Sequence, residues 1–165
     1  MDASKAFDRV QFIKLFNLLI DRGVCPLISK LLLSMYICQK MSVRWQGERS
    51  EPFDCSNGVK QGGVLSPVLF CIYMDALLDE LSKEGVGCHV GHAFAGALSY
   101  ADDLTLISPS LNSMKKMLSI CERFANSYDV LFNSSKSVSL IFNGKGEQAP
   151  LFLNGEEIPQ QSNAL

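Results

Sequence analysis

The sequence predicts an α+β fold, in which a small antiparallel sheet has helices packed on one face. Three observations support this class. Apolar residues recur at helical spacing in four segments of ten or more residues. Short β-prone runs lie between these segments and are bounded by turn-forming residues. With 165 residues and a hydrophobic content of 47%, the chain is long enough to bury one core.

The first part of the chain predicts two helices. One covers Gln11–Arg22 and ends at Gly23, and the other covers Pro26–Tyr36 with its proline in the first turn. Both helices should therefore pack through one apolar face. The side chains expected on these faces are Phe12, Leu15, Phe16 and Leu19 in the first helix and Ile28, Leu31, Leu32 and Met35 in the second.

The middle of the chain predicts a hairpin and a third helix. Met41–Trp45 and Glu51–Cys55 are β-prone runs, which we expect to pair across the turn Gln46–Ser50. Ser66-Pro67 combines the residue types favoured at a helix N-cap and at the first helical position. The third helix should start there and continue to Lys83. Its apolar face consists of Leu69, Ile72, Tyr73, Ala76, Leu77 and Leu81.

The last part of the chain combines short strands with one long helix. Asn112–Tyr128 predicts the helix, with a Met-rich and aromatic stripe that we interpret as core packing: Met114, Met117, Leu118, Cys121, Phe124 and Ala125. β-prone runs predict three further strands, at Gly87–Gly91, Ala93–Tyr100 and Ser137–Phe142. Leu151–Leu153 and Glu157–Ile158 predict a terminal hairpin around Asn154-Gly155.

Composition and charge restrict the function classes. The formal net charge of −2 argues against a chain that binds nucleic acid by itself, because phosphate contacts need clustered Lys and Arg. The six cysteines include no Cys-x-x-Cys pair, which indicates buried thiols in a reducing compartment. Cys88, His89 and His92 supply only one cysteine, so zinc is not expected there.

No targeting or membrane segment is expected. Met1 is followed by polar and charged residues instead of an apolar run. The apolar stretches are too short to span a bilayer. We therefore expect a soluble intracellular protein, located in the cytoplasm, the nucleus or both.

The most informative segment is Tyr100-Ala101-Asp102-Asp103, which lies between two strand-prone runs. Its residues favour a tight turn that joins two strands. Two adjacent carboxylates at the tip of a hairpin repel each other unless a cation neutralises them, so the segment favours a divalent metal ion. The alternative is an ordinary acidic turn that faces water.

Together with this turn, two other motifs resemble the reverse transcriptases of non-LTR (LINE-type) retrotransposons. They are Asp2-Ala-Ser-Lys-Ala-Phe-Asp-Arg-Val10 and Gly58-Val-Lys-Gln-Gly-Gly-Val-Leu-Ser-Pro67. The resemblance extends from Asp2 to at least Asn154 and implies a polymerase palm-like fold that is truncated at both ends. It implies a reverse transcriptase palm region at residues 1–143 and the start of the palm–thumb connection at residues 144–165. Basic segments of the family that lie outside this stretch would account for the low charge of the chain.

The resemblance implies an RNA-directed DNA polymerase that adds deoxynucleotides to a primer 3′-hydroxyl by two-metal nucleotidyl transfer. The implied cofactor is Mg²⁺, as two ions, with Mn²⁺ as a substitute. The implied partners in a full-length parent are an RNA template, a DNA primer or target, and a deoxynucleoside triphosphate. One alternative is a catalytically inactive remnant that retains only the fold. An Asp-based metal phosphohydrolase is less well supported, because His89 and His92 are remote from the motifs.

The family pattern also implies the metal ligands. Asp2 and Asp102 would bridge the metal ions, the carbonyl of Ala3 would add a ligand, and Asp103 would complete the acidic cluster. The alternative for Asp2 is a disordered terminal charge. Asp8 is interpreted as structural, either supporting the turn or pairing with a neighbouring Lys or Arg.

Four residues are implied to contact substrate. Phe7 stands where the family has an aromatic ring against the sugar of the nucleotide, and a ring there would exclude a 2′-hydroxyl. Its alternative role is to pack the following helix. Gln61 would hydrogen-bond the sugar or base edge, and Gly62 would let nucleic acid approach the backbone. Lys136, in Asn133-Ser-Ser-Lys136, would reach the triphosphate and protonate the leaving pyrophosphate.

Overall fold

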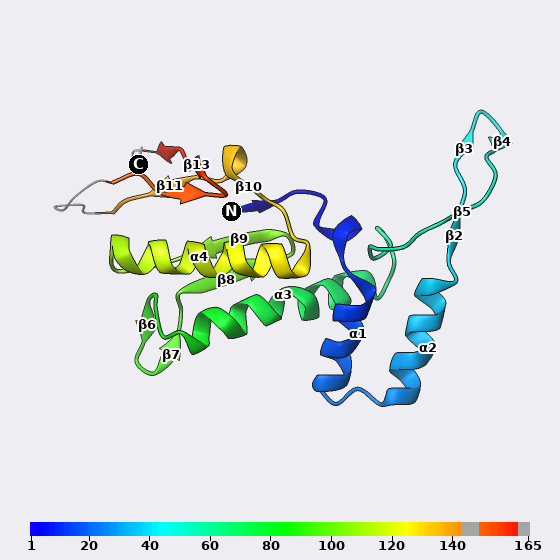
Figure 1. Cartoon of the computed structure of the whole chain (residues 1–165), viewed down its shortest axis with the longest axis horizontal. Helices are drawn as coiled ribbons and strands as arrows, with labels where there is room; N and C mark the ends of the chain where they lie inside the picture. Colours follow the sequence, from blue (N-terminus) through cyan, green and yellow to red (C-terminus); the bar gives the residue numbers. More distant parts are fainter. Residues whose placement is uncertain (143–148, 162–165) are drawn as a thin grey trace. The chain divides into compact units, whose positions relative to one another are not determined.

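The computed structural model describes residues 1–142 and 149–161 (Figure 1). These residues form two compact units. Unit 1 combines Met1–Ala6 with Met74–Leu165, and unit 2 is Phe7–Tyr73. The predicted boundary between residues 143 and 144 lies at the start of a segment outside the described residues, so that boundary stays a prediction.

Unit 1 contains a four-stranded antiparallel sheet with the strand order β10-β1-β9-β8. Its strands are β1 (Asp2–Ala3), β8 (Ala97–Tyr100), β9 (Asp103–Leu106) and β10 (Phe132–Asn133). The predicted acidic hairpin is confirmed: Tyr100 pairs with Asp103, and two residues form the turn between them. Ala101, the first turn residue, has a φ of +52°, as tight two-residue hairpins require at that position.

One face of this sheet carries the core of unit 1. Ala3 pairs with Phe132 across β1 and β10, and both side chains are buried. Leu104 exchanges two backbone hydrogen bonds with Met1 and is also buried. Because successive residues of a strand point to opposite faces, Asp2 and Asp103 point away from this core.

The predicted long helix is confirmed as α4 (Leu111–Tyr128). The Ser110 side chain accepts a hydrogen bond from the Ser113 amide, and Asp129 ends the helix with a φ of +52°. The expected stripe is buried except for Met114, which is half-buried. Burial raises the pKa of the Cys121 thiol to about 12, so this cysteine stays protonated and packs as a small apolar group.

The third predicted helix is confirmed as α3 (Ser66–Lys83), which runs from unit 2 into unit 1. Ser66 was expected as the N-cap, but it lies within the helix and its hydroxyl donates to the Lys60 carbonyl. Within unit 1, Glu80 of α3 forms an ion pair with Arg123 of α4 at 3.3 Å.

Three small two-stranded sheets complete unit 1. β6 (His89–Val90) pairs with β7 (Ala93–Phe94), and β11 (Ser139–Leu140) lies parallel to β14 (Gln160–Gln161). These strands are shorter than the runs that predicted them, and the single strand predicted at Ala93–Tyr100 is wrong: the run is divided into β7 and β8, which belong to different sheets. The terminal hairpin is confirmed as β12 (Phe152–Leu153) and β13 (Glu156–Glu157), and both residues of its Asn154-Gly155 turn have positive φ.

Unit 2 contains the two predicted helices, α1 (Phe12–Asp21) and α2 (Pro26–Ile37). The apolar face predicted for α1 is confirmed, since all four of its residues are buried. The face predicted for α2 is wrong. Ser29 and Tyr36 are its buried residues, whereas three of the four expected core residues are exposed: Ile28, Leu31 and Met35.

The aromatic packing between the helices explains this orientation of α2. The Tyr36 ring makes edge contacts with Phe12 and Phe16, at centroid distances of 5.4 and 6.1 Å. Apolar residues occupy nearly every face of α2, so their periodicity does not indicate which face is buried. The bulky tyrosine decides the orientation instead.

A long exposed hairpin follows α2 in unit 2 and appears in cyan in Figure 1. Its strands are β2 (Lys40–Met41), β3 (Arg44–Trp45), β4 (Glu48–Arg49) and β5 (Phe53–Asp54), where β2 pairs with β5 and β3 with β4. The predicted pairing is confirmed, but the turn is tighter than expected. It contains only Gln46 and Gly47, which both have positive φ.

No helix in the described residues has the length and apolar character needed to cross a membrane.

Candidate active site

Three polar residues form a row across the open face of the unit 1 sheet. Asp2 on the central strand β1 pairs with Asp103 of β9 on one side and with Asn133 of β10 on the other. Residues directly opposite each other share a face, with Cβ atoms about 4.5–5.5 Å apart. Met1 and Leu104 exchange two hydrogen bonds, so the adjacent Asp2–Asp103 pair is of the type in which side chains approach most closely.

The two carboxylates in this row repel each other. Like charges directly opposite on neighbouring strands destabilise a sheet, and a nearby cation reduces that cost. The Lys136 ammonium lies 3.8 Å from a carboxylate oxygen of Asp2 and supplies part of this positive charge. The lysine side chain is 65% exposed and that of Asp2 is 31% exposed, so the ion pair contributes only about 0–1 kcal/mol.

Asn133 explains how Lys136 reaches Asp2. Its side-chain oxygen accepts hydrogen bonds from the amides of Ser135 and Lys136, at 3.0 and 3.3 Å, and starts the 3-10 helix η2 (Ser134–Lys136). The chain therefore turns back immediately after β10. The sequence reasoning assigned no role to Asn133, although Asn before two serines is typical of such side-chain caps.

Asp102 is the half-buried second residue of the turn between β8 and β9. The structure thus brings Asp2 and Asp103 together as neighbours on adjacent strands, with Asp102 next to Asp103 in sequence. Within residues 1–142 and 149–161, no three His, Cys, Asp or Glu side chains are grouped so as to hold a metal ion. The roles of Asp102 and of the Ala3 carbonyl as metal ligands stay predictions.

Phe7 belongs to the 3-10 helix η1 (Ala6–Arg9), and its side chain lies in unit 2. Its ring stacks on that of Phe70, with centroids 4.5 Å apart and an interplanar angle of 18°. Phe70 is buried, whereas Phe7 is half-buried. One side of the Phe7 ring is therefore held by packing, while part of the ring stays accessible to solvent.

The glycine-rich motif packs against the segment that contains Phe7. The Val59 amide donates to the Phe7 carbonyl at 2.8 Å, and the Gly58 amide donates to the Val10 carbonyl at 2.9 Å. The Gln61 side-chain amide lies 3.4 Å from a carboxylate oxygen of Asp8 and donates to it. Two motifs separated by about fifty residues thus form one surface of unit 2, and Gln61 is an Asp8 partner that the sequence reasoning missed.

The glycines of this motif have different roles. Gly58 has a φ of +89°, and a Cβ atom there would lie 2.8 Å from the Asp8 carbonyl oxygen. Gly62 has a φ of +80° in a turn that the Gly63 amide closes by donating to the Lys60 carbonyl. No atom lies within 4 Å of a Cβ placed at Gly62, so this position is open. Gly58 is required for packing and Gly62 for the turn.

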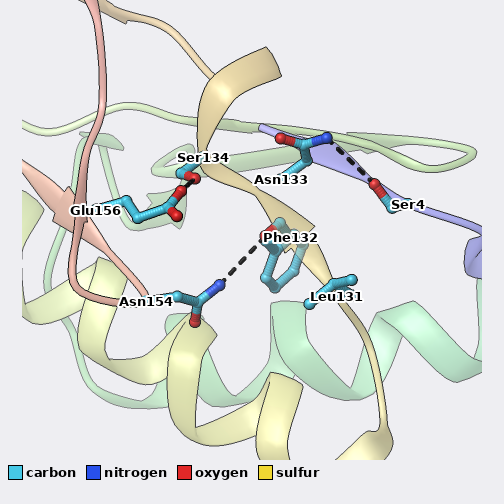
Figure 2. Close-up of a pocket in the computed structure, with 7 residues that line it drawn as sticks. All are labelled: Ser4, Leu131, Phe132, Asn133, Ser134, Asn154 and Glu156. Atoms are coloured by element: carbon cyan, nitrogen blue, oxygen red, sulfur yellow. Dashed lines mark hydrogen bonds between the residues drawn. The ribbon is translucent and has the colours of Figure 1, made fainter.

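An open cleft of about 310 Å³ adjoins the polar row in unit 1 (Figure 2). It is lined by Ser4, Leu131, Phe132, Asn133, Ser134, Asn154 and Glu156. The Asn133 amide donates to the Ser4 hydroxyl at 3.4 Å, and the Asn154 amide donates to the Phe132 carbonyl at 3.2 Å. Ser134 donates to Glu156. The Asn-Gly pattern predicted the terminal hairpin but not these contacts with β10.

Comparison with known proteins finds one matching family and several similar proteins. Residues 1–158 match the family described as reverse transcriptase (RNA-dependent DNA polymerase). The chain is 31% identical, over 148 residues, to a retrovirus-related Pol polyprotein from a type-2 retrotransposable element of Drosophila melanogaster. This match covers 90% of the chain and 14% of the relative.

Two further relatives extend the comparison. A Pol polyprotein from a type-1 retrotransposable element of Popillia japonica is 30% identical over 85% of the chain and 20% of its own length. An uncharacterised 149 kDa transposon protein of Xenopus laevis is 27% identical over 86% of the chain and 11% of its own length. The chain spans a fifth or less of the length of each of these relatives.

Proposed function

The chain belongs to the reverse transcriptase (RNA-dependent DNA polymerase) family, in its non-LTR retrotransposon branch, and from this premise we propose that it carries the catalytic residues of DNA synthesis on an RNA template. Its α+β fold is consistent with a palm fragment of such an enzyme. The observation that carries the proposal is the pairing of Asp2 with Asp103 on the open face of the sheet. Two carboxylates held together at a cost in stability indicate a site selected for binding a cation.

The family uses divalent metal ions, and the donor types in the polar row fit such ions. Asp2 and Asp103 supply hard carboxylate oxygen atoms, which Mg²⁺ and Mn²⁺ prefer. Bound metal ions would activate the primer hydroxyl and stabilise the charge of the leaving pyrophosphate. We propose that Asp2 and Asp103 hold them, together with Asp102 and the Ala3 carbonyl.

The remaining residues would position the substrates. The exposed part of the Phe7 ring would lie against the sugar of a deoxynucleoside triphosphate, and stacking on Phe70 would keep the ring rigid. Gln61 is exposed and anchored by Asp8, so it could hydrogen-bond a sugar or base without reorganising. Lys136 would exchange its contact with Asp2 for a triphosphate oxygen when a metal ion takes over the neutralisation of Asp2.

A Mn²⁺ titration of the purified chain, followed by calorimetry or electron paramagnetic resonance, tests the proposed metal site. Asp2→Asn and Asp103→Asn should each weaken Mn²⁺ binding by at least about tenfold, because each removes a charged oxygen ligand. Glu84→Gln is the matched control, since it neutralises an exposed carboxylate of unit 1 that does not belong to the polar row. Equal affinities in all four proteins would contradict the proposal.

The second candidate is an inactive remnant of such a polymerase. It is favoured by the Lys136–Asp2 ion pair, which neutralises Asp2 within the chain, and by the absence of a three-carboxylate group in the described residues. A remnant should not bind Mn²⁺ more tightly than the two Asp→Asn variants do. The titration therefore separates the two candidates.

Substitution of Phe7 by Ala tests the predicted sugar selection in a polymerase that contains this chain. If the ring excludes a 2′-hydroxyl, Phe7→Ala should admit ribonucleotides and leave deoxynucleotide incorporation largely intact, because a repulsion is removed. Incorporation of both nucleotide types should be measured together with the melting temperature. Phe70→Leu is the control, since it removes the stacking partner and keeps the Phe7 ring. A loss of about 3–5 kcal/mol in stability with unchanged selectivity would instead assign Phe7 to the core.

A further inference from the structure

The tip of the exposed hairpin in unit 2 holds two arginines directly opposite each other. Arg44 of β3 pairs with Arg49 of β4, so their side chains lie on the same face of the hairpin. Both residues are exposed. Like charges in such a pair destabilise the hairpin, and the short β3–β4 ladder has only one other residue pair to offset that cost.

No acidic side chain compensates this pair within the described residues. Trp45 pairs with Glu48, which places the Glu48 carboxylate on the opposite face of the hairpin. The structure shows no ion pair between either arginine and Glu51 or Asp54, the acidic residues that follow β4. The two guanidinium groups are therefore available to an anion from outside the chain.

The geometry favours a phosphate group as that anion. Each guanidinium presents several N–H donors in a plane and binds phosphate oxygens in a bidentate manner. Two of them on adjacent strands can contact one phosphate or two successive phosphates of a nucleic-acid strand. Because the net charge of the chain is −2, attraction to nucleic acid must come from local positive sites of this kind.

We propose that Arg44 and Arg49 bind the phosphate backbone of the template–primer duplex, and this inference rests on the proposed polymerase function. The contact is independent of base sequence, since no base edge is read. In the free protein the two arginines repel each other, and this repulsion lowers the stability of the hairpin that carries the binding site. The site lies on the β3–β4 hairpin of unit 2, whereas the carboxylates of the polar row belong to unit 1.

The test combines binding with stability. Binding of the purified chain to a fluorescent RNA–DNA duplex is measured by anisotropy at several salt concentrations, for the wild type and for Arg44→Gln/Arg49→Gln. The double variant should bind about tenfold more weakly, and its slope of log affinity against log salt should fall by about 2. Arg44→Gln alone should raise the melting temperature, because it removes the like-charge pair.

Lys115→Gln/Lys116→Gln is the matched control, because it removes two exposed positive charges of α4. Equal losses of duplex affinity in the double arginine variant and the double lysine variant would overturn the proposal. An unchanged slope of log affinity against log salt in the double arginine variant would also overturn it, as would a wild-type chain that does not bind the duplex at low salt. Glu84→Gln should bind the duplex like the wild type. If Asp2→Asn loses Mn²⁺ binding but the double arginine variant binds the duplex like the wild type, this inference is refuted and the polymerase function stands. If the double arginine variant loses duplex affinity but Asp2→Asn keeps its Mn²⁺ affinity, only the metal site is refuted.

Discussion

Replacing either Asp2 or Asp103 with asparagine is expected to reduce nucleotide incorporation by on the order of 10³-fold, or about 4 kcal/mol of transition-state stabilisation. The two carboxylates are paired across β1 and β9 on the open face of the sheet. Asparagine keeps the size and one oxygen of the side chain, but it loses the charge that holds a divalent ion. The effect should therefore appear in kcat for primer extension.

The same substitutions should not reduce stability. Each removes a repulsion between like charges, so the melting temperature should stay constant or rise. Asp2→Asn also removes the exposed ion pair with Lys136, which is worth little. Lost activity without lost stability is the result that distinguishes a metal-binding role from a structural one.

Primer extension is best measured in a chimera in which the part of this chain that matches the Drosophila relative replaces the matched segment of that relative. The assay contains Mg²⁺, an RNA template and four deoxynucleoside triphosphates. Glu84→Gln again serves as the control for the loss of one carboxylate charge. If both Asp→Asn variants keep incorporation within about tenfold of the unsubstituted chimera, the catalytic assignment is wrong.

Substitution of Gly58 by alanine is expected to destabilise unit 2 by about 2–5 kcal/mol, through backbone strain and steric overlap together. The φ of +89° at this position is unfavourable for any residue with a Cβ atom. The added Cβ would also lie 2.8 to 3.0 Å from three backbone atoms of Asp8. Backbone atoms cannot move aside as a flexible side chain can, so the two segments would have to separate.

That separation would break two backbone hydrogen bonds, from Gly58 to Val10 and from Val59 to Phe7. Urea denaturation followed by circular dichroism measures the loss of stability, and hydrogen exchange at the Val59 amide locates it. Gly23→Ala is the matched control in unit 2. Gly23 also has a positive φ, of +80°, but no atom lies within 4 Å of its added Cβ. If both substitutions cost the same, the contact with Asp8 has no importance for stability.

Local patterns in the sequence predicted most of the secondary structure. The four helices follow from apolar periodicity and end signals, and the hairpin at Asn154-Gly155 follows from its turn residues. These features depend on interactions between residues a few positions apart, which a local pattern records directly. The three motifs likewise predicted the family, which the match over residues 1–158 confirms.

The orientation of α2 could not be predicted in this way. Its apolar residues surround the helix, so several faces satisfy the hydrophobic pattern equally well. The ring contacts of Tyr36 with α1 select one of them and leave Leu31 and Met35 exposed. The two-residue strand β10 was also missed, because a run so short has no measurable periodicity.

The sequence by itself thus determined the helices, the acidic turn between β8 and β9 and the family of the chain. Only the tertiary structure decided that Asp2 lies between Asp103 and Asn133, that Lys136 contacts Asp2, and that Gly58 packs on Asp8. The physical reason is that these contacts join residues about fifty to more than one hundred positions apart. Strand register and the packing of the whole core set such contacts, and no local pattern records either of them.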